Sequence, residues 1–386
     1  MTLVLRLGNQ EFSDWKRFEA SRSVSDATAQ FSLEVTESAS VPPAFVARKL
    51  RSGAEIEMVL DGIVAITGKV DDVSRSFDKE DHRVSLRGRG AMRDAIDASV
   101  ILPDGGQLRN RTLDQVLAAV LDPFGLALEF VGDPGPPFPS VVPQLGETAW
   151  EMIERLSRMR GFWVHETATG VVRADRGVRP GIAGALIEGE NILIGSSTDR
   201  SQARHSEIVV KAQRPGGDRV AGIETSEIEA RVPDVNVGAY RPLVIVAEEP
   251  LDRAGARFRA DWEATVRAAE SLEAEIVVVG WTRPDGALWD AGDLLDVVSP
   301  TLALDRDMAV RDVRWSLDDN GGHLTTLSLV PPEALDATKP APAPQPAAAA
   351  EEKTTHRRGR AVPGVASEGF DVDPIWTETK PTELAK

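Results

Sequence analysis

The chain has 386 residues, 42% of them hydrophobic, and its formal net charge at pH 7 is -17. We expect roughly two to four domains, and no apolar run reaches the ~18 residues that a membrane span requires. The N-terminal residues do not predict a signal peptide. The absence of cysteine excludes disulfides, zinc–thiolate sites and cysteine nucleophiles, and favours synthesis in a reducing cytoplasm. The excess of acidic residues argues against a nucleic-acid-binding surface. It is compatible with a channel that DNA passes through, because an acidic wall repels DNA.

Residues 1–100 are predicted to form a first β-rich, tube-like domain. Residues 28–36 alternate between apolar and polar side chains, as a half-buried strand does. Asp61-Gly62 lies between two apolar runs, which is the pattern of a two-residue hairpin turn.

Residues 101–180 are predicted to form a small inserted α+β module. One helix is expected to begin at Thr112 and end before Pro123, and a second to begin near Glu147 and end at Gly161. Between them, residues 132–139 (GDPGPPFP) are rich in proline and glycine and predict an extended connector.

Residues 181–335 are predicted to form a second β-rich, tube-like domain with a long helix at 251–273. Apolar residues recur at spacings of three and four along this helix, with Asp252 as the expected N-cap. We expect Trp262 to lie at the centre of the buried face. We also expect the helix to cover the antiparallel strands that follow it. Trp262→Ala should lower the free energy of unfolding by ~3–5 kcal/mol.

Two segments of the β-rich parts resemble each other. Residues 72–78 (DVSRSFD) align with residues 312–318 (DVRWSLD), and each segment precedes a polar loop, a histidine and a strand that contains Ser-Leu. The shared context predicts that one β unit occurs twice in the chain.

Residues 336–386 are predicted to be a Pro/Ala-rich linker followed by a flexible, extended tail. This segment has few apolar residues and is not expected to fold alone. We predict that it binds a neighbouring protein through a basic patch and two aromatic anchors, which are Arg357, Arg358, Arg360, Phe370 and Trp376.

We find no pattern that predicts catalysis. Asp71 and Asp72 are adjacent in a predicted strand and should point to opposite faces, so they do not form an acid–base pair. The histidines and carboxylates have no metal-ligand spacing, and no glycine-rich loop opens into a helix as a phosphate site does. We therefore predict no catalytic residue, no cofactor and no metal. We also expect the tryptophans at 262, 281, 289 and 315 to be core residues.

The chain resembles the baseplate hub family of Mu-type contractile-tailed phages. The resemblance is carried by the order of several segments over residues 1–335 and not by any single motif. These segments include residues 146–156 (GETAWEMIERL), 259–263 (RADWE), 285–289 (DGALW) and 327–333 (LSLVPPE).

This resemblance implies a fold and a set of partners. Such hubs are structural trimers, similar to the hub of T-even phages and to the base of type VI secretion spikes. Each subunit has two barrel-like tube domains, so that three subunits match a hexameric tail tube. The implied partners are two further copies of the chain, the tail tube protein, the central spike protein and other baseplate proteins, with DNA only in transit. The implied location is the baseplate of the virion tail, assembled in the cytoplasm of a bacterial host.

Two other functions remain open from the sequence. A cell-wall hydrolase would need paired acids in a cleft, and the 101–180 module supplies only Asp114, Asp122, Glu147, Glu151 and Glu154. A peptidoglycan- or sugar-binding module would need exposed aromatic side chains as a stacking platform. The residues thus favour a fold of the α+β class, mainly β, with a structural function.

Overall fold

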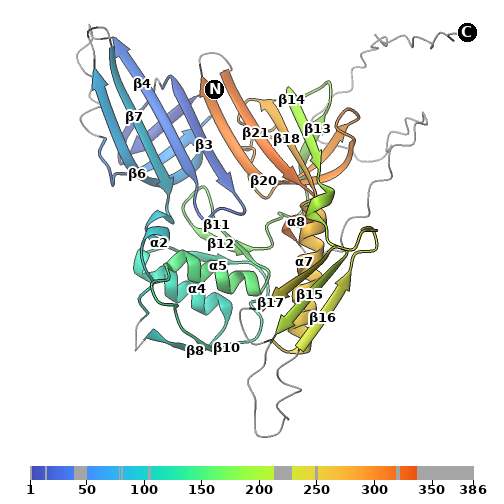
Figure 1. The fold of residues 1–386 in the computed structure, drawn as a ribbon. Helices are drawn as coiled ribbons and strands as arrows, with labels where there is room; N and C mark the ends of the chain where they lie inside the picture. Colours follow the sequence, from blue (N-terminus) through green and yellow to red (C-terminus); the bar gives the residue numbers. More distant parts are fainter. Residues whose placement is uncertain are drawn as a thin grey trace, which may run out of the picture. The chain divides into compact units, whose positions relative to one another are not determined.

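The computed structural model describes residues 2–13, 15–38, 50–77, 79, 81–102, 106–212, 228–247, 251–318 and 322–336 (Figure 1). The described chain is mainly β with few helices, which confirms the predicted class. Its largest sheet has 13 strands, and its main hydrogen-bonded path runs from β14 (Ile194–Asp199) at one end to β2 (Gln10–Phe12) at the other, with two strands that branch from this path. Because this path is open, the barrel-like character of the two β-rich parts stays a prediction.

The strands before residue 91 form one half of the large sheet. Asp61 and Gly62 both have positive φ, at 50° and 84°, and connect β5 to β6 as the predicted tight hairpin turn. The strands are β1 (Leu3–Leu7), β2 (Gln10–Phe12), β3 (Arg17–Ser23), β4 (Gln30–Ser38), β5 (Glu55–Leu60), β6 (Ile63–Phe77) and β7 (Asp81–Gly90).

The other half of the sheet comes from later segments and ends in a short helix. Its elements are β13 (Ile182–Ile187), β14 (Ile194–Asp199), β18 (Leu272–Val279), β19 (Leu294–Ser299), β20 (Leu304–Asp318), β21 (Gly322–Val330) and α8 (Pro332–Leu335). The two halves are joined because β20 pairs antiparallel with β3 (Figure 1). One hydrophobic core, which includes Phe18, Trp281 and Trp315, lies under both halves.

The two halves repeat one order of strands, although the last pair differs in direction, because β1 is antiparallel to β5 and β13 is parallel to β19. In the first set the neighbours are β3-β4-β7-β6-β5-β1, and in the second set they are β14-β18-β21-β20-β19-β13. The two central strands, β6 and β20, both have 15 residues and both pair with the next strand as a hairpin. Each has a register shift at the same place, between Val70 and Asp72 and between Val310 and Asp312. The predicted internal repeat is therefore present in the fold.

The turn before β5 and the turn before β19 are also equivalent. The Gly53 N–H donates to the Val70 carbonyl at 2.7 Å, and the Gly292 N–H donates to the Val310 carbonyl at 2.7 Å. Both glycines have positive φ, at 81° and 86°, a conformation that side chains with a Cβ rarely adopt. The repeat extends to the backbone hydrogen bonds that close each turn.

A module of short helices and strands lies between the two halves in sequence. Its second long helix, α5, begins with a capping box in which Thr148 and Glu151 each satisfy the other's backbone N–H. A separate hydrophobic core holds the module together. The elements are α2 (Arg93–Asp97), β8 (Leu108–Arg111), α4 (Leu113–Leu121), η1 (Asp122–Phe124), β9 (Leu128–Phe130), β10 (Phe138–Val141), α5 (Ala149–Met159), β11 (Trp163–Glu166) and β12 (Val172–Asp175).

A third group of elements contains the long helix α7 (Arg253–Ala269). The Asp252 side chain accepts a hydrogen bond from the Gly255 N–H at 2.8 Å, so the predicted N-cap is confirmed. The helix packs on a three-stranded sheet through Ala256 and Ala260, whose small side chains allow close approach. The sheet and its preceding turn are η2 (Ser201–Ala203), β15 (Glu207–Ala212), β16 (Ile228–Pro233) and β17 (Pro242–Val246).

The structure corrects three expectations about this helix. The predicted 251–273 helix is too long, because Leu272 already pairs with Asp199 in the β14–β18 ladder. The helix packs mainly on β15 and β16 and not on the antiparallel strands that follow it. Trp262 is only half-buried and Phe258 is 46% exposed, since the alanine stripe is the face that packs. The loss of unfolding free energy predicted for Trp262→Ala is therefore too large.

Candidate functional site

The carboxylates that could suggest acid–base chemistry have structural partners. Asp71 accepts hydrogen bonds from Arg89 Nε at 2.8 Å and from Arg93 Nη1 at 3.1 Å. Asp72 is exposed. The two side chains do not share a site.

Three acids of the small module are engaged in ion pairs or in a helix cap. Glu147 binds Arg155 Nε at 2.8 Å, and Glu154 binds Arg158 at 2.6 Å. Burial raises the pKa of Glu147, but the hydrogen bonds from Arg155 and a backbone N–H outweigh it and hold this pKa below the ordinary value. Glu151 caps helix α5. These contacts hold the helices in place and leave no paired acids in a cleft among them.

Two buried titratable residues are consecutive on β11, so their side chains point to opposite faces. Burial lowers the pKa of His165 to about 4, so this histidine is neutral at pH 7. Burial raises the pKa of Glu166 to about 7, although three hydrogen bonds oppose the shift. Glu166 accepts from the Ala29 N–H at 2.6 Å and from the Met92 N–H at 3.0 Å. It thereby connects the small module to the first half of the sheet.

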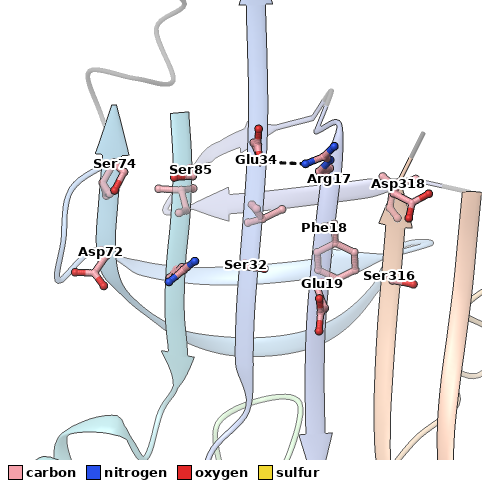
Figure 2. Close-up of a pocket in the computed structure, with 15 residues that line it drawn as sticks. Arg17, Phe18, Glu19, Ser32, Glu34, Asp72, Ser74, Ser85, Ser316 and Asp318 are labelled. Atoms are coloured by element: carbon pink, nitrogen blue, oxygen red, sulfur yellow. Dashed lines mark ion pairs between the residues drawn. The ribbon is translucent and has the colours of Figure 1, made fainter. Parts of the chain in front are cut away.

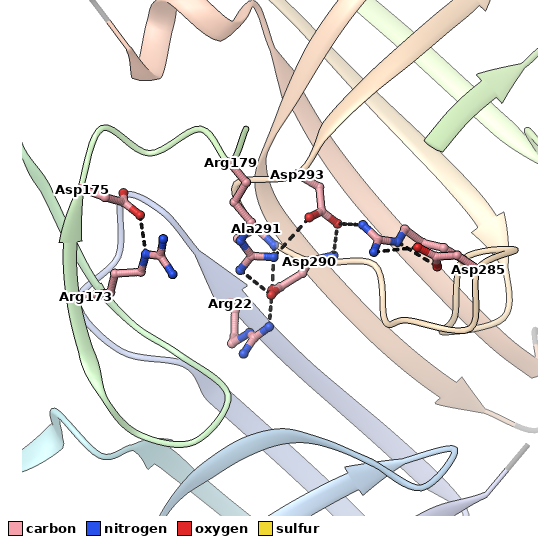
Figure 3. Close-up of polar contacts among 9 residues, drawn as sticks. Arg22, Arg173, Asp175, Arg179, Asp285, Asp290, Ala291 and Asp293 are labelled. Atoms are coloured by element: carbon pink, nitrogen blue, oxygen red, sulfur yellow. Dashed lines mark hydrogen bonds and ion pairs between the residues drawn. The ribbon is translucent and has the colours of Figure 1, made fainter. Parts of the chain in front are cut away.

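A buried charge network lies beside the β20–β3 junction (Figure 3). Asp290 binds Arg22 from β3 and Arg179 at 2.6 Å. Asp293 binds Arg179 at 3.1 Å and Arg283 at 2.7 Å. Burial raises the pKa of Asp290, but Coulombic attraction to Arg22 and Arg179 outweighs it and keeps the carboxyl ionised. The network connects β3 with the turn that precedes β19.

One face of the sheet is polar across both halves. Buried and polar residues alternate along β3, β4, β7 and β20, which follows from the two-residue period of a strand. A hollow of about 680 Å³ crosses these strands and β6, and Figure 2 shows its polar side chains and the ion pair of Arg17 with Glu34. The hydroxyl side chains in this hollow are Ser32, Ser74, Ser85 and Ser316.

A second hollow of about 400 Å³ is lined by β3, β18, β20 and β21 together with residues 25–28. It adds further hydroxyl groups, namely Ser21, Ser23, Ser25, Thr28, Thr326 and Ser328. Carboxylates outnumber arginines along the two hollows, with Glu19, Asp26, Glu34, Asp72, Glu275, Asp312 and Asp318 against Arg17, Arg22, Arg87, Arg311 and Arg314. Such a surface is well hydrated and mildly acidic, and it offers no row of cations to a phosphate backbone.

The tryptophans do not form a sugar-binding platform. Trp281 and Trp315 have no exposed surface and Trp289 is 3% exposed, so their prediction as core residues is confirmed. An apolar groove of about 910 Å³ does lie between residues 133–140 and helix α7, where Phe258 is partly exposed.

The predicted tail contacts lie outside the described residues; they are Arg357, Arg358, Arg360, Phe370 and Trp376. Within the described ranges, no group of three or more histidine or carboxylate side chains is arranged to hold a metal ion. None of the helices described here has the length and apolar character that a membrane crossing requires.

Neither the charge network nor the continuous polar face was predicted from the sequence. In β3, Phe18 and Ala20 point to the core, and Arg22 is the next residue on that face. A cation at an inward position of an alternating strand is a signal for a buried ion pair. The polar face could have been found from the serines at outward positions of four strands.

Three family models match the chain in order. Residues 2–90 match the N-terminal domain of Mu phage baseplate assembly protein GpP-like proteins. Residues 93–175 match the second domain of baseplate hub protein gp44-like proteins. Residues 252–338 match the fourth domain of Mu phage baseplate assembly protein GpP.

Individual proteins are similar over most of the chain. The baseplate hub protein gp44 of Escherichia phage Mu is 29% identical over 346 residues, which cover 86% of this chain and 89% of that protein. A 43 kDa tail protein of prophage MuSo2 from Shewanella oneidensis is 31% identical. Its crystal structure covers 87% of this chain and all of its own, with a TM-score of 0.76.

A more distant structural match shows a shared fold alone. It is an E. coli component of the type VI secretion system, described as structurally similar to the T4 bacteriophage tail proteins gp27 and gp5. It is 13% identical, covers 86% of this chain and 77% of its own, and has a TM-score of 0.53.

Proposed function

The chain belongs to the family of Mu-type phage baseplate hub proteins, and we propose that three copies form a ring joining the hexameric tail tube to the trimeric central spike. It is a structural hub protein of a Mu-like phage tail, located in the baseplate of the virion. Its relatives are structural proteins, and no catalytic family is indicated.

The repeated set of strands is the main observation that supports a trimer. Each copy has two equivalent sets, with the same strand order and the same register shift in the 15-residue strand. Three copies would therefore present six equivalent sets, which is the number that a hexameric tube needs for matched contacts. Closed cyclic symmetry of this kind is the usual arrangement of protein rings.

The polar face is the part of the molecule best suited to line the DNA passage. Its small hydroxyl groups bind water, and several of its arginines are paired with carboxylates, as Arg17 is with Glu34 and Arg314 is with Glu19 at 3.3 Å. Phosphates would have to compete with these carboxylates for the arginines, so DNA would gain less by binding. A lumen wall of this kind would let DNA slide through without retaining it.

The C-terminal segment is the proposed attachment point for another baseplate or spike protein. Its basic residues Arg357, Arg358 and Arg360 would meet an acidic partner surface, and Phe370 and Trp376 would supply the apolar anchors. Aromatic and arginine side chains carry much of the energy at protein interfaces. Assembly would take place in the host cytoplasm, where a chain without cysteine has no need of an oxidising compartment.

Sedimentation equilibrium of the purified chain tests this proposal. A homotrimer has three times the mass of the 41.6 kDa chain. Monomers or dimers at micromolar concentration, together with fewer or more than three copies in the assembled tail, would overturn it.

A further inference from the structure

The apolar groove of about 910 Å³ beside residues 133–140 has walls from three parts of the chain, which are the small module, strand β17 and helix α7. Large apolar side chains in it reach solvent, since Phe258 is 46% exposed and Val246 is 72% exposed. Exposed apolar surface that gathers in a groove and has polar residues at its rim commonly marks a binding site. The groove has room for a short stretch of another chain but not for a domain.

The wall formed by the module offers few backbone hydrogen-bond donors. Four of residues 134–139 (PGPPFP) are prolines, which have no N–H. The Gly135 N–H already donates to the Asp133 carboxylate at 2.9 Å. A ligand is therefore not expected to pair with this wall as a β-strand, and side-chain contacts must provide the recognition.

Two arginines beside the groove stack on aromatic rings. The Arg160 guanidinium lies 4.6 Å from the centre of the Phe138 ring, and the Arg176 guanidinium lies 4.2 Å from the centre of the Phe162 ring. Stacking fixes the plane of a guanidinium and the direction of its N–H groups. The groove thus presents oriented donors next to an apolar surface.

Arg176 has no anionic partner within hydrogen-bond distance in the described part of the chain. It donates to the carbonyls of Arg160 at 2.9 Å and Gly161 at 2.6 Å. Burial lowers the pKa of this guanidinium, and the charge of Asp336 opposes the shift only in part. A half-buried cation in this position is stabilised when a ligand supplies a carboxylate.

The other charges of the lining also favour an anionic ligand. The cations that line the groove are Arg160, Arg176 and Arg259, and the acids are Asp133 and Asp252. Both acids already accept hydrogen bonds from backbone N–H groups, as Asp252 does at the start of α7. The groove therefore has a small excess of positive charge around an apolar lining.

The groove lies apart from the repeated sets of strands. None of the described residues that line it belongs to a strand of the large sheet. A ring that is built through the repeated sets does not require this surface, which leaves it to a protein of another kind.

From the apolar lining and the guanidinium of Arg176 we infer that the groove binds a short acidic segment of another baseplate protein. A carboxylate of that segment binds Arg176, and a neighbouring aromatic or branched aliphatic side chain packs against Phe258 and Val246. This inference rests on the proposed hub function and specifies one of its contacts.

Photo-cross-linking in assembled tails tests the contact. A benzophenone amino acid in place of Phe258 or of Val246 should form a covalent adduct with another baseplate protein. Mass spectrometry should find an acidic residue close to an aromatic or branched aliphatic residue in the cross-linked peptide. The matched control places the same amino acid at Val235, which is 90% exposed and does not line the groove, and it should not give this peptide.

Two substitutions test the chemistry with the benzophenone at position 246. Arg176→Gln should lower the adduct yield several-fold, whereas Arg253→Gln removes an exposed cation of α7 outside the groove and should leave the yield unchanged. Phe258→Ser should also lower the yield. Because the Phe258 side chain is already partly exposed, this variant should keep a melting temperature close to that of the wild type, which separates lost binding from lost folding.

The outcomes separate this inference from the proposed function. An adduct with the sequence of this chain itself, or no adduct in tails that contain the chain, would overturn the inferred ligand and leave the hub function standing. Equal yields in the wild type, Arg176→Gln and Phe258→Ser would overturn the assigned contacts. If purified tails contain no copy of the chain, the hub function is wrong as well.

Discussion

Replacing Asp290 with alanine should lower the free energy of unfolding by about 3–5 kcal/mol. Asp290 is the common partner of Arg22 and Arg179, and its own Oδ1 also accepts from the Ala291 N–H at 2.8 Å. The alanine variant would leave the Arg22 guanidinium buried without its carboxylate.

The magnitude follows from the burial of each partner. The Arg22 side chain is 6% exposed and its guanidinium lies 5.4 Å from the Trp315 ring, so solvent cannot replace the lost charge. Removing one partner of a buried pair costs ~3–5 kcal/mol. Arg179 is 38% exposed, and its share of the loss is reduced by solvent screening.

Thermal melting followed by circular dichroism measures this effect. Asp305→Ala removes an exposed carboxylate from β20 and serves as the control, with an expected change within ~0.5 kcal/mol. In Arg22→Met/Asp290→Ala the stranded cation is gone and an apolar side chain occupies its buried position, so much of the stability should return. An unchanged melting temperature in Asp290→Ala, or no recovery in the double variant, would mean that the buried Arg22–Asp290 pair does not stabilise the fold.

Three further predictions concern the core, the module contact and the tail. Trp315→Ala should cost about 3–5 kcal/mol in a melting experiment, since this side chain has no exposed surface; a loss below ~1 kcal/mol would contradict its place in the core. Because burial raises the pKa of Glu166 from 4.5 to about 7, its stabilising contribution is complete below pH 4.5 and is lost as pH rises through 7. Wild type should therefore lose about 3 kcal/mol relative to Glu166→Gln over that range, and parallel pH profiles would argue against it. Deleting residues 336–386 should leave the trimer and its melting curve intact while weakening attachment of the partner protein; loss of trimers would place the tail in the core fold.

Much of the fold could be predicted because it depends on short-range patterns. Asp61-Gly62 indicates its hairpin turn, and Thr148 with Glu151 indicates a helix start, since each signal acts within a few residues. The repeat of residues 72–78 in 312–318 marks two strands that carry the same irregularity. Patterns of this kind need no knowledge of the tertiary structure.

The contacts of α7 and the charge network could not be predicted in the same way. Large apolar side chains such as Phe258 and Trp262 dominate a helical pattern, yet the packed face is the stripe of Ala256 and Ala260. Which face packs depends on β15 and β16, which lie outside the helix, so the pattern within the helix does not reveal it. Likewise, Arg22 and Asp290 are 268 residues apart and meet only once β20 pairs with β3.

Electron cryomicroscopy of the assembled tail tests the ring most directly. We expect three copies of the chain around the tail axis, six sets of strands in one ring, and the face with Ser32, Ser74 and Ser316 toward the lumen. A ring of six copies, or a polar face turned away from the axis, would contradict it.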